Sequence, residues 1–155
     1  MLIRSSPHVV IRDSDVCGTD AQTLLGELNA ALTALTRSSG ACRFCKEDVM
    51  GPRGAFMIVY VEGEPYACGG LRPRSHLTAE IKRVYARRNH LHLGNRLLRA
   101  LERRAARLGY KRLVLETRRI NGHAVSFYRQ NGYRPCAPYG SYVGRPEAIC
   151  LEKRL

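Results

Sequence analysis

The chain has 155 residues, of which 45% are hydrophobic and 25% are charged, the balance of an ordinary globular protein with room for one sizeable core. It carries 26 Lys and Arg residues against 13 Asp and Glu residues, which gives a formal net charge of +13 and a pI near 10.0. This charge favours an anionic partner, such as nucleic acid, an acidic surface or a polyphosphate, without choosing among them.

No targeting or membrane segment is visible. The stretch MLIRSSPHVV lacks the apolar core of a signal peptide, and the longest apolar run, AFMIVYV, is too short to span a bilayer. The cysteines follow no framework pattern, which favours reduced thiols over disulfides in a chain without a secretion signal. They are Cys17, Cys42, Cys45, Cys68, Cys136 and Cys150. We expect a protein of the cytoplasm, with no membrane partner.

The first half of the chain predicts a strand, a helix and a hairpin. The run VVIRDSD begins as a strand and breaks on Asp and Ser. Leucines at positions 24, 25, 28, 32 and 35 recur at helical spacing within residues 19–36. Two apolar runs within residues 54–72 are joined across Glu62-Gly63-Glu64, which is typical of a hairpin.

The second half predicts alternating strands and helices. The expected strands cover 79–85, where apolar and polar residues alternate, 111–117 and 148–155, and the expected helices cover 95–108 and 121–131. Gly109 and Gly132 are expected to end the two helices. No linker or repeat divides the chain, so the order predicts a single α/β domain, residues 1–155, around a mixed sheet.

A loop that runs into the helix of residues 95–108 suggests an anion site. The free N–H groups and the positive dipole end of a helix attract phosphates, and such loops usually hold several glycines that let the backbone approach closely. This loop has Gly94 as its single glycine. The helix itself has an apolar stripe and a basic one, and the basic stripe consists of Arg96, Arg99, Arg103 and Arg107.

The segment 109–133 carries the most specific pattern. Its residues Asn121, Ala124, Tyr128, Gly132 and Tyr133 form the arrangement N-x-x-A-x-x-x-Y-x-x-x-G-Y. This arrangement resembles the C-terminal motif of the GNAT superfamily of N-acetyltransferases. Upstream, ACGGLRP, AEIKRVYA, a loop into a helix and LLRALERRAARLGYKRLVLET follow the order of that family. The resemblance covers roughly residues 55 to 155.

The resemblance implies the GNAT fold, a mixed sheet of about six or seven strands flanked by about four helices, with two central strands splayed apart. It also implies direct acetyl transfer from acetyl-CoA, a co-substrate, to a primary amine, with no acyl-enzyme and no metal. The splayed strands would be AEIKRVYA and KRLVLET. The backbone of Val84, Tyr85 and Ala86 would then pair with the amides of the pantetheine arm, and the pyrophosphate would rest on the helix that begins near Asn95.

The phosphate loop departs from the family pattern, which is Gln or Arg, two residues, Gly, one residue, then Gly or Ala. The matching residues are Asn89, His90, Leu91, His92, Leu93 and Gly94. His92 stands in place of a glycine, and its side chain narrows the approach of the backbone to a phosphate. Two interpretations stay open: the loop binds with help from neighbouring basic residues, or acetyl-CoA binding is weakened or lost. The intact motif around Tyr128 favours the first.

The reaction needs an acid for the leaving thiolate and a base for the amine. By position, Tyr128 matches the family tyrosine that protonates the departing sulfur; the alternative is a core aromatic. Glu80 is our first choice for the base and Glu116 the second, because burial in an apolar cleft raises the pKa of a carboxyl group toward neutral pH. Either carboxylate could instead pair with a nearby Arg, and many family members use water.

Three further residues complete the predicted site. Asn121 resembles the asparagine that bonds the pantetheine arm, and it is also an ordinary helix N-cap. Tyr139 and Tyr142 stand in a loop before the last strand, where the fold places the acceptor side. We expect the amine pocket there, with an ordinary Tyr/Gly/Pro loop as the equal alternative.

Several signals and one rival function remain. The CRFC motif, residues 42–45, lacks a second pair of zinc ligands, so we interpret its thiols as incidental. The rival function is a basic module on the same fold that has lost acetyl-CoA binding and docks nucleic acid or an acidic protein. The acceptor of the favoured enzyme is a small-molecule or peptide amine, and a homodimer is compatible with the family.

Overall fold

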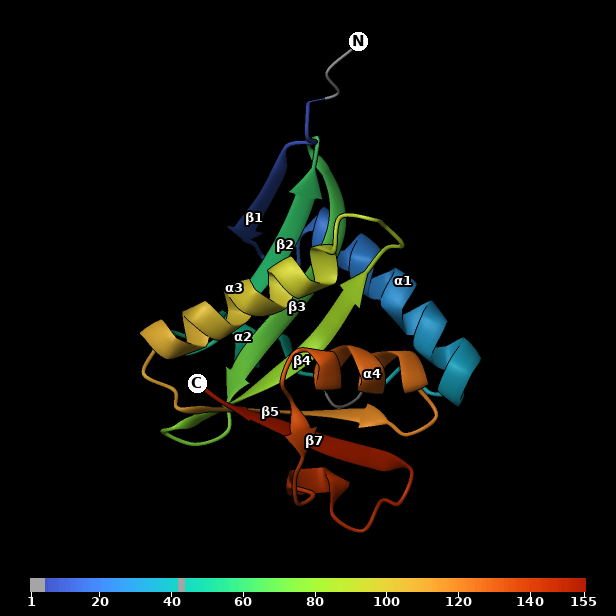
Figure 1. The fold of residues 1–155 in the computed structure, drawn as a ribbon, viewed down its shortest axis with the longest axis vertical. Coiled ribbons are helices and arrows are strands. Elements are labelled where there is room, and N and C mark those ends of the chain that lie inside the picture. Colours follow the sequence, from blue (N-terminus) through green and yellow to red (C-terminus); the bar gives the residue numbers. More distant parts are fainter. Residues whose placement is uncertain (1–4, 42–43) are drawn as a thin grey trace.

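The computed structural model describes residues 5–41 and 44–155. A seven-stranded sheet runs through it in the order β1-β2-β3-β4-β5-β7-β6 (Figure 1). The strands are β1 (Val9–Asp13), β2 (Ala55–Val61), β3 (Glu64–Pro73), β4 (Thr78–Ala86), β5 (Arg112–Arg118), β6 (Arg134–Pro135) and β7 (Ala148–Arg154). The helices are α1 (Thr19–Thr36), α2 (Lys46–Met50), α3 (Leu93–Arg107) and α4 (Gly122–Gln130), with a 3-10 turn, η2 (Gly140–Tyr142).

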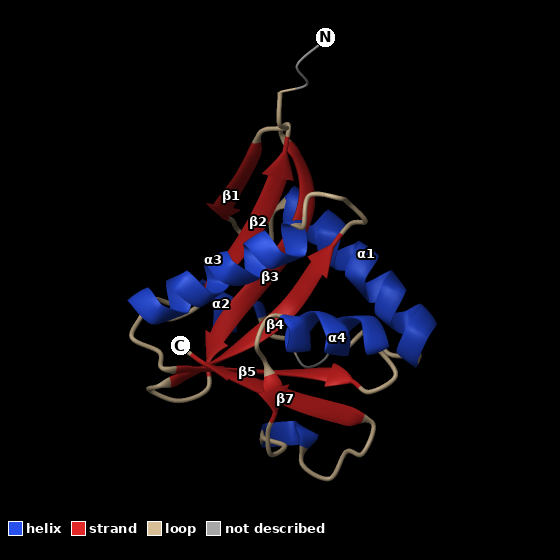
Figure 2. Cartoon of the chain, viewed as in Figure 1, coloured by secondary structure: helices blue, strands red, loops and turns tan. Residues whose placement is uncertain are grey.

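The helices lie on both faces of the sheet (Figure 2). Helices α3 and α4 cover one face, and α1 and α2 cover the other. The predicted α/β fold, a mixed sheet of seven strands flanked by four helices, is confirmed.

The two central strands diverge. Strands β4 and β5 are parallel, and they pair only at Thr78–Arg112, Ala79–Leu113 and Glu80–Val114. Beyond Glu80 and Val114 the strands continue without pairing, and Figures 1 and 2 show them separating from a common point. The expected splay is therefore present, and it leaves one edge of the second half of β4 without a strand partner.

Turn chemistry explains where several elements end. Glu62 and Gly63 both have positive φ, 50° and 83°, as the two-residue turn between antiparallel strands requires. Gly109 (φ 89°) follows the end of α3, where the Tyr110 N–H donates to the Ala105 carbonyl at 3.0 Å. Gly132 (φ 89°) follows α4 in the same way. The predicted hairpin and both helix ends are confirmed.

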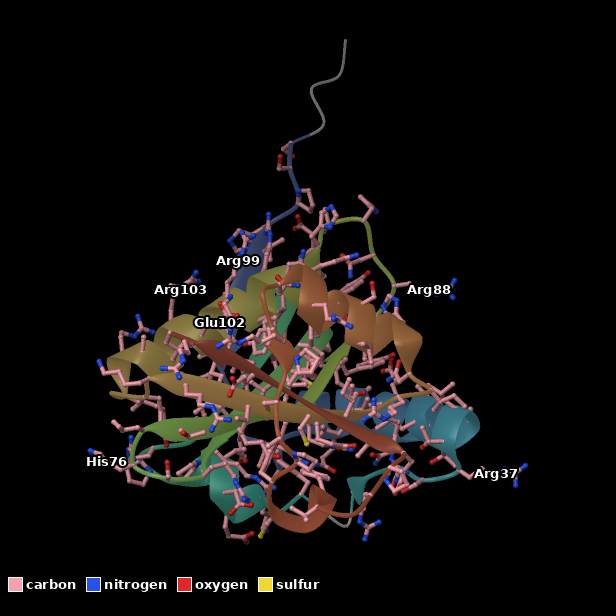
Figure 3. The ribbon with its side chains drawn as sticks, turned by 60° about the horizontal axis from the view of Figure 1, so that its bottom comes forward. Arg37, His76, Arg88, Arg99, Glu102 and Arg103 are labelled. Carbon is pink, nitrogen blue, oxygen red and sulfur yellow. The ribbon has the colours of Figure 1, made fainter. Side chains whose placement is uncertain are left out.

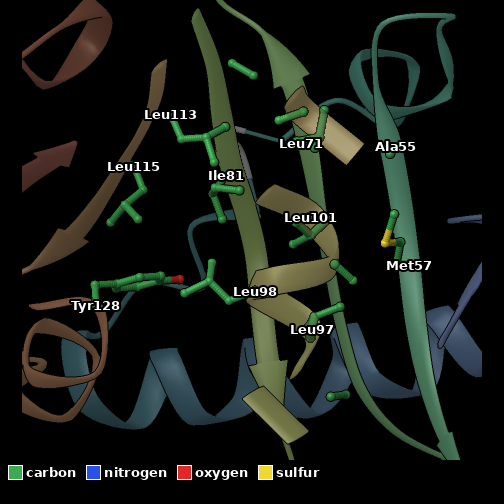
Figure 4. Packing of buried hydrophobic residues seen from close by; sticks show 14 of the residues in the cluster. Ala55, Met57, Leu71, Ile81, Leu97, Leu98, Leu101, Leu113, Leu115 and Tyr128 are labelled. Atoms are coloured by element: carbon green, nitrogen blue, oxygen red, sulfur yellow. The ribbon is translucent and has the colours of Figure 1, made fainter. Parts of the chain in front are cut away.

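The core on the α3 side is built from leucines of the predicted apolar stripe. Leu97, Leu98 and Leu101 are fully buried against Ile81 and the inner residues of β2, β3 and β5 (Figure 4). Each such side chain contributes about 1.5–3 kcal/mol on burial. This packing fixes α3 across the sheet and so holds its N-terminus near the end of β4.

Some sequence-based boundaries were wrong. Helix α3 begins at Leu93, two residues before the expected Asn95, because the buried Leu93 side chain extends the apolar stripe into the preceding loop. Leu35 in α1 is 42% exposed and does not belong to the buried stripe. Helix α2, strand β6 and the 3-10 turn were not predicted, since each is too short for a periodic pattern.

The predicted alternation from Ala79 to Tyr85 is interrupted in β4. Gly70 pairs with Lys82 and Cys68 pairs with Tyr85, so Arg83 and Val84 together oppose the single residue Gly69. This is a β-bulge, and its residue Arg83 has a positive φ of 58°. A Cβ at Gly69 would lie 3.0 Å from the Val84 side chain, which explains the glycine opposite the bulge.

Within the described part of the chain, every helix is too short or too polar to cross a bilayer. The described cysteines, Cys17, Cys45, Cys68, Cys136 and Cys150, are all free. Cys42, and with it the predicted CRFC motif as a whole, lies outside the described residues.

Candidate active site

A cavity of about 150 Å³ opens where β4 and β5 separate. Its walls come from both central strands and from helices on both faces of the sheet. Residues that line it include Leu28 and Leu32 of α1, Lys82, Arg83 and Val84 of β4, Glu116 and Arg118 of β5, and Asn121 and Tyr128 of α4, with Tyr142. The cavity therefore passes between the strands and connects the α1 side with the α4 side.

Tyr128 lies on the α4 side of this cavity. The residue is 8% exposed, and its ring packs edge-on against Tyr133 at 5.6 Å and points from α4 toward Leu98 (Figure 4). Burial raises the pKa of the Tyr128 phenol well above its ordinary value. The hydroxyl therefore keeps its proton at any physiological pH, as a proton donor must. The predicted core role is also present, since Tyr128 belongs to the α3-side core.

Asn121 performs the capping role and lines the same cavity. Its Oδ1 accepts a hydrogen bond from the Ala124 N–H at 3.2 Å, which satisfies one free N–H group of α4. The cap fixes the start of α4, and the same helix carries Tyr128 near its C-terminal end, on the side of the cavity.

The two predicted carboxylates lie in different environments. Glu80 is fully buried and does not line the cavity. Its Oε1 accepts from Arg72 Nε at 2.7 Å, and its Oε2 accepts from the Tyr139 hydroxyl at 2.5 Å. The second nitrogen of Arg72 contacts Asp48 at 2.7 Å, so Glu80 belongs to a buried ion-pair network between β3, β4 and α2.

Glu116 lies on the wall of the cavity, two residues beyond the last β4–β5 pair. Of the neighbouring arginines, Arg118 contacts Glu147 at 3.5 Å, and Arg119 Nε donates to the Pro146 carbonyl at 2.9 Å. Lys82 faces the same space. Burial lowers the pKa of the Lys82 ammonium, while the negative charges of Glu80 and Glu116 raise it by a smaller amount.

Of the two tyrosines predicted on the acceptor side, one lines the cavity and the other does not. Tyr142 is buried and lines the cavity, and its hydroxyl accepts from Lys82 Nζ at 3.0 Å. Tyr139 packs edge-on against Tyr142 at 5.3 Å but does not line the cavity, because its hydroxyl is directed to Glu80.

The second half of β4 presents the edge that the splay exposes. Val84 lines the cavity, and Ala86 pairs with Ala67 of β3 on the other edge. The Tyr85 side chain points instead to α1, where its hydroxyl donates to Glu27 at 3.2 Å. The free backbone edge from Val84 to Ala86 fits an extended chain of amides, which can pair with it as a strand would.

The loop after β4 is organised by Asn89. Its Oδ1 accepts from the Leu91 N–H at 2.9 Å and the Leu93 N–H at 3.3 Å. His90 and His92 are exposed, and His92 has the left-handed backbone (φ 54°) that favours glycine. Gly94 and Asn95 now lie in the first helical turn, where the N–H groups have no partner within the helix.

The exposed face of α3 is basic, as predicted. Figure 3 shows Arg99 and Arg103 on its outer side, and Arg96 and Arg107 are exposed as well. Among the described residues these four arginines form no ion pair, whereas the neighbouring Arg104 contacts Asp13 at 2.7 Å. An anion that approaches the N-terminus of α3 therefore meets a positive field along the whole helix.

No group of three or more His, Cys, Asp or Glu residues is placed to hold a metal ion in the parts of the chain that the structure describes. Cys45 caps the short helix α2, and its thiol donates to Glu47 Oε2 at 2.7 Å.

Comparison with known proteins agrees with this geometry. The sequence model of the Acetyltransferase (GNAT) family matches residues 28–133, a span that contains both diverging strands, α3 and α4. The chain belongs to the GNAT family of acetyltransferases. It is an acyltransferase enzyme, and the GNAT assignment explains the splayed strands as well as the motif around Tyr128.

Relatives of this GNAT enzyme match it along nearly its whole length. The uncharacterized N-acetyltransferase YsnE of Bacillus subtilis (strain 168) is 26% identical over 153 residues, which cover 94% of this chain and 99% of the relative. A solved structure from Klebsiella pneumoniae subsp. pneumoniae, assigned to the acyl-CoA N-acyltransferases, has a TM-score of 0.79 at 26% identity and covers 95% of this chain and 97% of its own.

A GNAT family acetyltransferase from Elizabethkingia anophelis was solved with acetyl-CoA bound. It superimposes with a TM-score of 0.70 at 18% identity, over 95% of this chain and 98% of its own. At that identity the likeness shows the fold.

The cavity residues that were not predicted from the sequence include the adjacent cations Lys82 and Arg83. Adjacent residues of a regular strand point to opposite faces, so one of the two would enter the α3-side core. The signal was the interval between the apolar residues Ile81 and Val84, which is three residues rather than two and which marks the bulge.

Proposed function

We propose that this protein transfers an acetyl group from acetyl-CoA to a primary amine by direct attack, without an acyl-enzyme. One observation carries the proposal: Tyr128 and Glu116 line the same cavity in the opening between β4 and β5. A proton donor and a proton acceptor thus face one reaction volume, as an acyl transfer to an amine requires.

Residues of this chain would bind the amide arm and the phosphates of the donor. The free edge at Val84 to Ala86 would hold the amide arm, Asn121 would bond to it, and the N-terminus of α3 at Gly94 and Asn95 would hold the pyrophosphate. The arginines of α3 would attract the remaining phosphate charge. The bound donor supplies an acetyl thioester.

Glu116 is the general base in this proposal, in preference to Glu80. Glu116 would take a proton from the ammonium form of the acceptor, and the neutral amine would then attack the acetyl carbon. As the carbon–sulfur bond breaks, Tyr128 would give its phenolic proton to the departing sulfur and recover a proton from the newly formed amide nitrogen. Glu80 keeps Arg72 and Tyr139 in place and does not face the cavity.

Calorimetric titration tests the donor part. We expect acetyl-CoA to bind with micromolar affinity and, at a 100-fold excess over its dissociation constant, to stabilise the fold by about 2.7 kcal/mol. Dephospho-CoA, titrated alongside, measures what the arginines of α3 contribute through the phosphate that it lacks. No heat and no thermal stabilisation with acetyl-CoA would overturn the proposal, and polyanion binding with a steep salt dependence would then be measured instead.

A further inference from the structure

The bulge in β4 places two cations side by side in the cavity. Ile81 and Val84 pack in the α3-side core and also border the cavity, and Lys82 and Arg83 between them line the cavity as well. Arg83 holds a left-handed backbone (φ 58°), which is unfavourable by about 1–2 kcal/mol for a residue with a side chain. The surrounding structure therefore maintains a strained conformation that keeps this guanidinium on the cavity wall.

The contacts of Arg83 are neutral. Its Nη1 donates to the Ser39 carbonyl at 2.9 Å, its Nη2 donates to the Asn29 side-chain oxygen, and its guanidinium carbon lies 5.9 Å from the centre of the Phe44 ring. Its Nε is buried and has no hydrogen-bond partner among the described residues. A half-buried arginine stays charged and requires an anion or several acceptors around it, so a donor and a positive charge remain available.

The other charges near the cavity largely compensate one another. Arg118 pairs with Glu147, and Glu80 pairs with Arg72 outside the cavity. Among the described residues that line the cavity, Glu116 is the single carboxylate, and Lys82 faces it as a source of positive charge. The wall therefore has an excess of positive charge, and the excess is centred on Arg83.

We propose that the acceptor amine carries a carboxylate, which binds Arg83 on the α1 side while the amine faces Glu116. This inference rests on the proposed acetyl transfer and narrows its substrate class. An Arg guanidinium binds carboxylates in a fixed, directional geometry. A polycationic acceptor would need several carboxylates on the wall, where Glu116 stands among Lys82, Arg83 and Arg118.

The size and the apolar part of the cavity add to this description. A volume of about 150 Å³ holds a small molecule rather than a folded protein segment. Leu28 and Leu32 of α1 form an apolar wall beside Arg83. The acceptor class is therefore a small amino acid with an apolar side chain.

The first experiment compares matched acceptors. We would measure CoA release with L-leucine, L-methionine and L-phenylalanine, each as the free acid and as the carboxamide, and with spermidine. The wild-type enzyme should prefer each acid over its amide in kcat/KM. In Arg83→Gln that preference should fall at least 10-fold, mainly through KM, and Arg83→Lys should restore part of it. Comparison of the ratio between variants cancels the different basicity of the two amines.

A second variant leaves Arg83 in place. Asn29→Asp is nearly isosteric and adds a carboxylate where Arg83 Nη2 now donates to an amide oxygen. The new carboxylate should neutralise the guanidinium, raise the KM of the acids about 10-fold and leave the amides unchanged. Arg37→Gln is the matched control, because Arg37 has the same left-handed backbone (φ 59°) but is exposed and points away from the protein (Figure 3).

The outcomes separate this inference from the function on which it rests. A wild-type enzyme that binds acetyl-CoA but acetylates the acids no faster than the amides or spermidine overturns the carboxylate proposal alone. If kcat/KM falls equally for acids and amides in both Arg83→Gln and Asn29→Asp, the proposal is also overturned, since such a result indicates that Arg83 has a structural role. Absence of acetyl-CoA binding in the wild type overturns the proposed function itself.

Discussion

The hydroxyl of Tyr139 donates a 2.5 Å hydrogen bond to Glu80 Oε2, and the other oxygen of that carboxylate accepts from Arg72 Nε at 2.7 Å. Glu80 is thus held from both sides in a position without solvent contact. The pair fixes the loop before β7 against β4 at the point where β4 and β5 separate. A residue that resembles a catalytic base in the sequence here supports the walls of the site.

Glu80→Gln should therefore reduce stability more than catalysis. The substitution leaves the Arg72 charge with Asp48 as its remaining acidic contact, and loss of one partner of a buried ion pair lowers the free energy of unfolding by about 3 kcal/mol. Thermal unfolding followed by circular dichroism should show a Tm lower by roughly 6–12 °C. Asp48→Asn is the control: its carboxylate is 39% exposed, so its loss should shift Tm much less.

Glu116→Gln should have the opposite profile. Removal of the general base lowers kcat by about 100-fold or more, while the fold loses little because Glu116 lies on the cavity wall. Steady-state kinetics at a temperature well below both Tm values compares the two variants directly. A larger loss of kcat in Glu80→Gln than in Glu116→Gln would make Glu80 the general base and leave Glu116 with a structural role.

Tyr128→Phe should lower kcat by about 100-fold and leave acetyl-CoA affinity and Tm nearly unchanged, because only the hydroxyl is removed from a ring that stays packed. Since burial raises the pKa of Tyr128, its ionisation should produce no alkaline loss of kcat below pH 10. Tyr133→Phe provides the matched control, with a hydroxyl directed to Glu102 at 3.0 Å. Equal activity of both variants would remove Tyr128 from the mechanism.

The long helices and strands could be predicted from the sequence because the apolar residues that form their periodic patterns are the residues that pack in the core. Leu97, Leu98 and Leu101 are examples, and Gly109 ends α3 because only its backbone can turn there without strain. The site was harder to predict, because its charges are arranged by tertiary contacts. Arg72 lies eight residues from Glu80 and nothing local selects it as the partner.

The bulge in β4 could not be predicted from local sequence either, because it depends on pairing with a second strand. Arg83 reaches the cavity only because two residues of β4 oppose Gly69 of β3, and this register depends on both strands. Asn121 caps α4 and Tyr128 lies near its end, as the sequence pattern predicts, because a helix cap and a spacing within one helix are local features.

Helix α3 offers a paired test of the phosphate loop. His92→Gly removes an exposed side chain from a position with φ 54°, where glycine is favoured, so acetyl-CoA affinity should rise while stability changes by less than about 1 kcal/mol. Gly94→Ala should keep or increase stability, because the new Cβ would lie 3.5 Å from Phe127, an ordinary contact. The same methyl group should lower acetyl-CoA affinity about 10-fold. Calorimetric titration of both variants with acetyl-CoA measures these affinities. An unchanged affinity in Gly94→Ala would mean that the pyrophosphate binds away from the N-terminus of α3.

The buried thiol of Cys68 predicts a pH dependence of stability. Burial raises its pKa from 9.0 to about 12 in the folded protein, so above pH 9 the unfolded chain loses this proton while the folded chain retains it. The stabilisation is complete below pH 9 and is lost as the pH rises toward 12, by at most about 1.4 kcal/mol per pH unit. Urea unfolding between pH 8 and pH 10.5 should show a steeper decline for the wild type than for Cys68→Ala. Cys17→Ala, at an exposed thiol, should retain the wild-type slope. Parallel curves for wild type and Cys68→Ala would mean that the thiol ionises equally in both states.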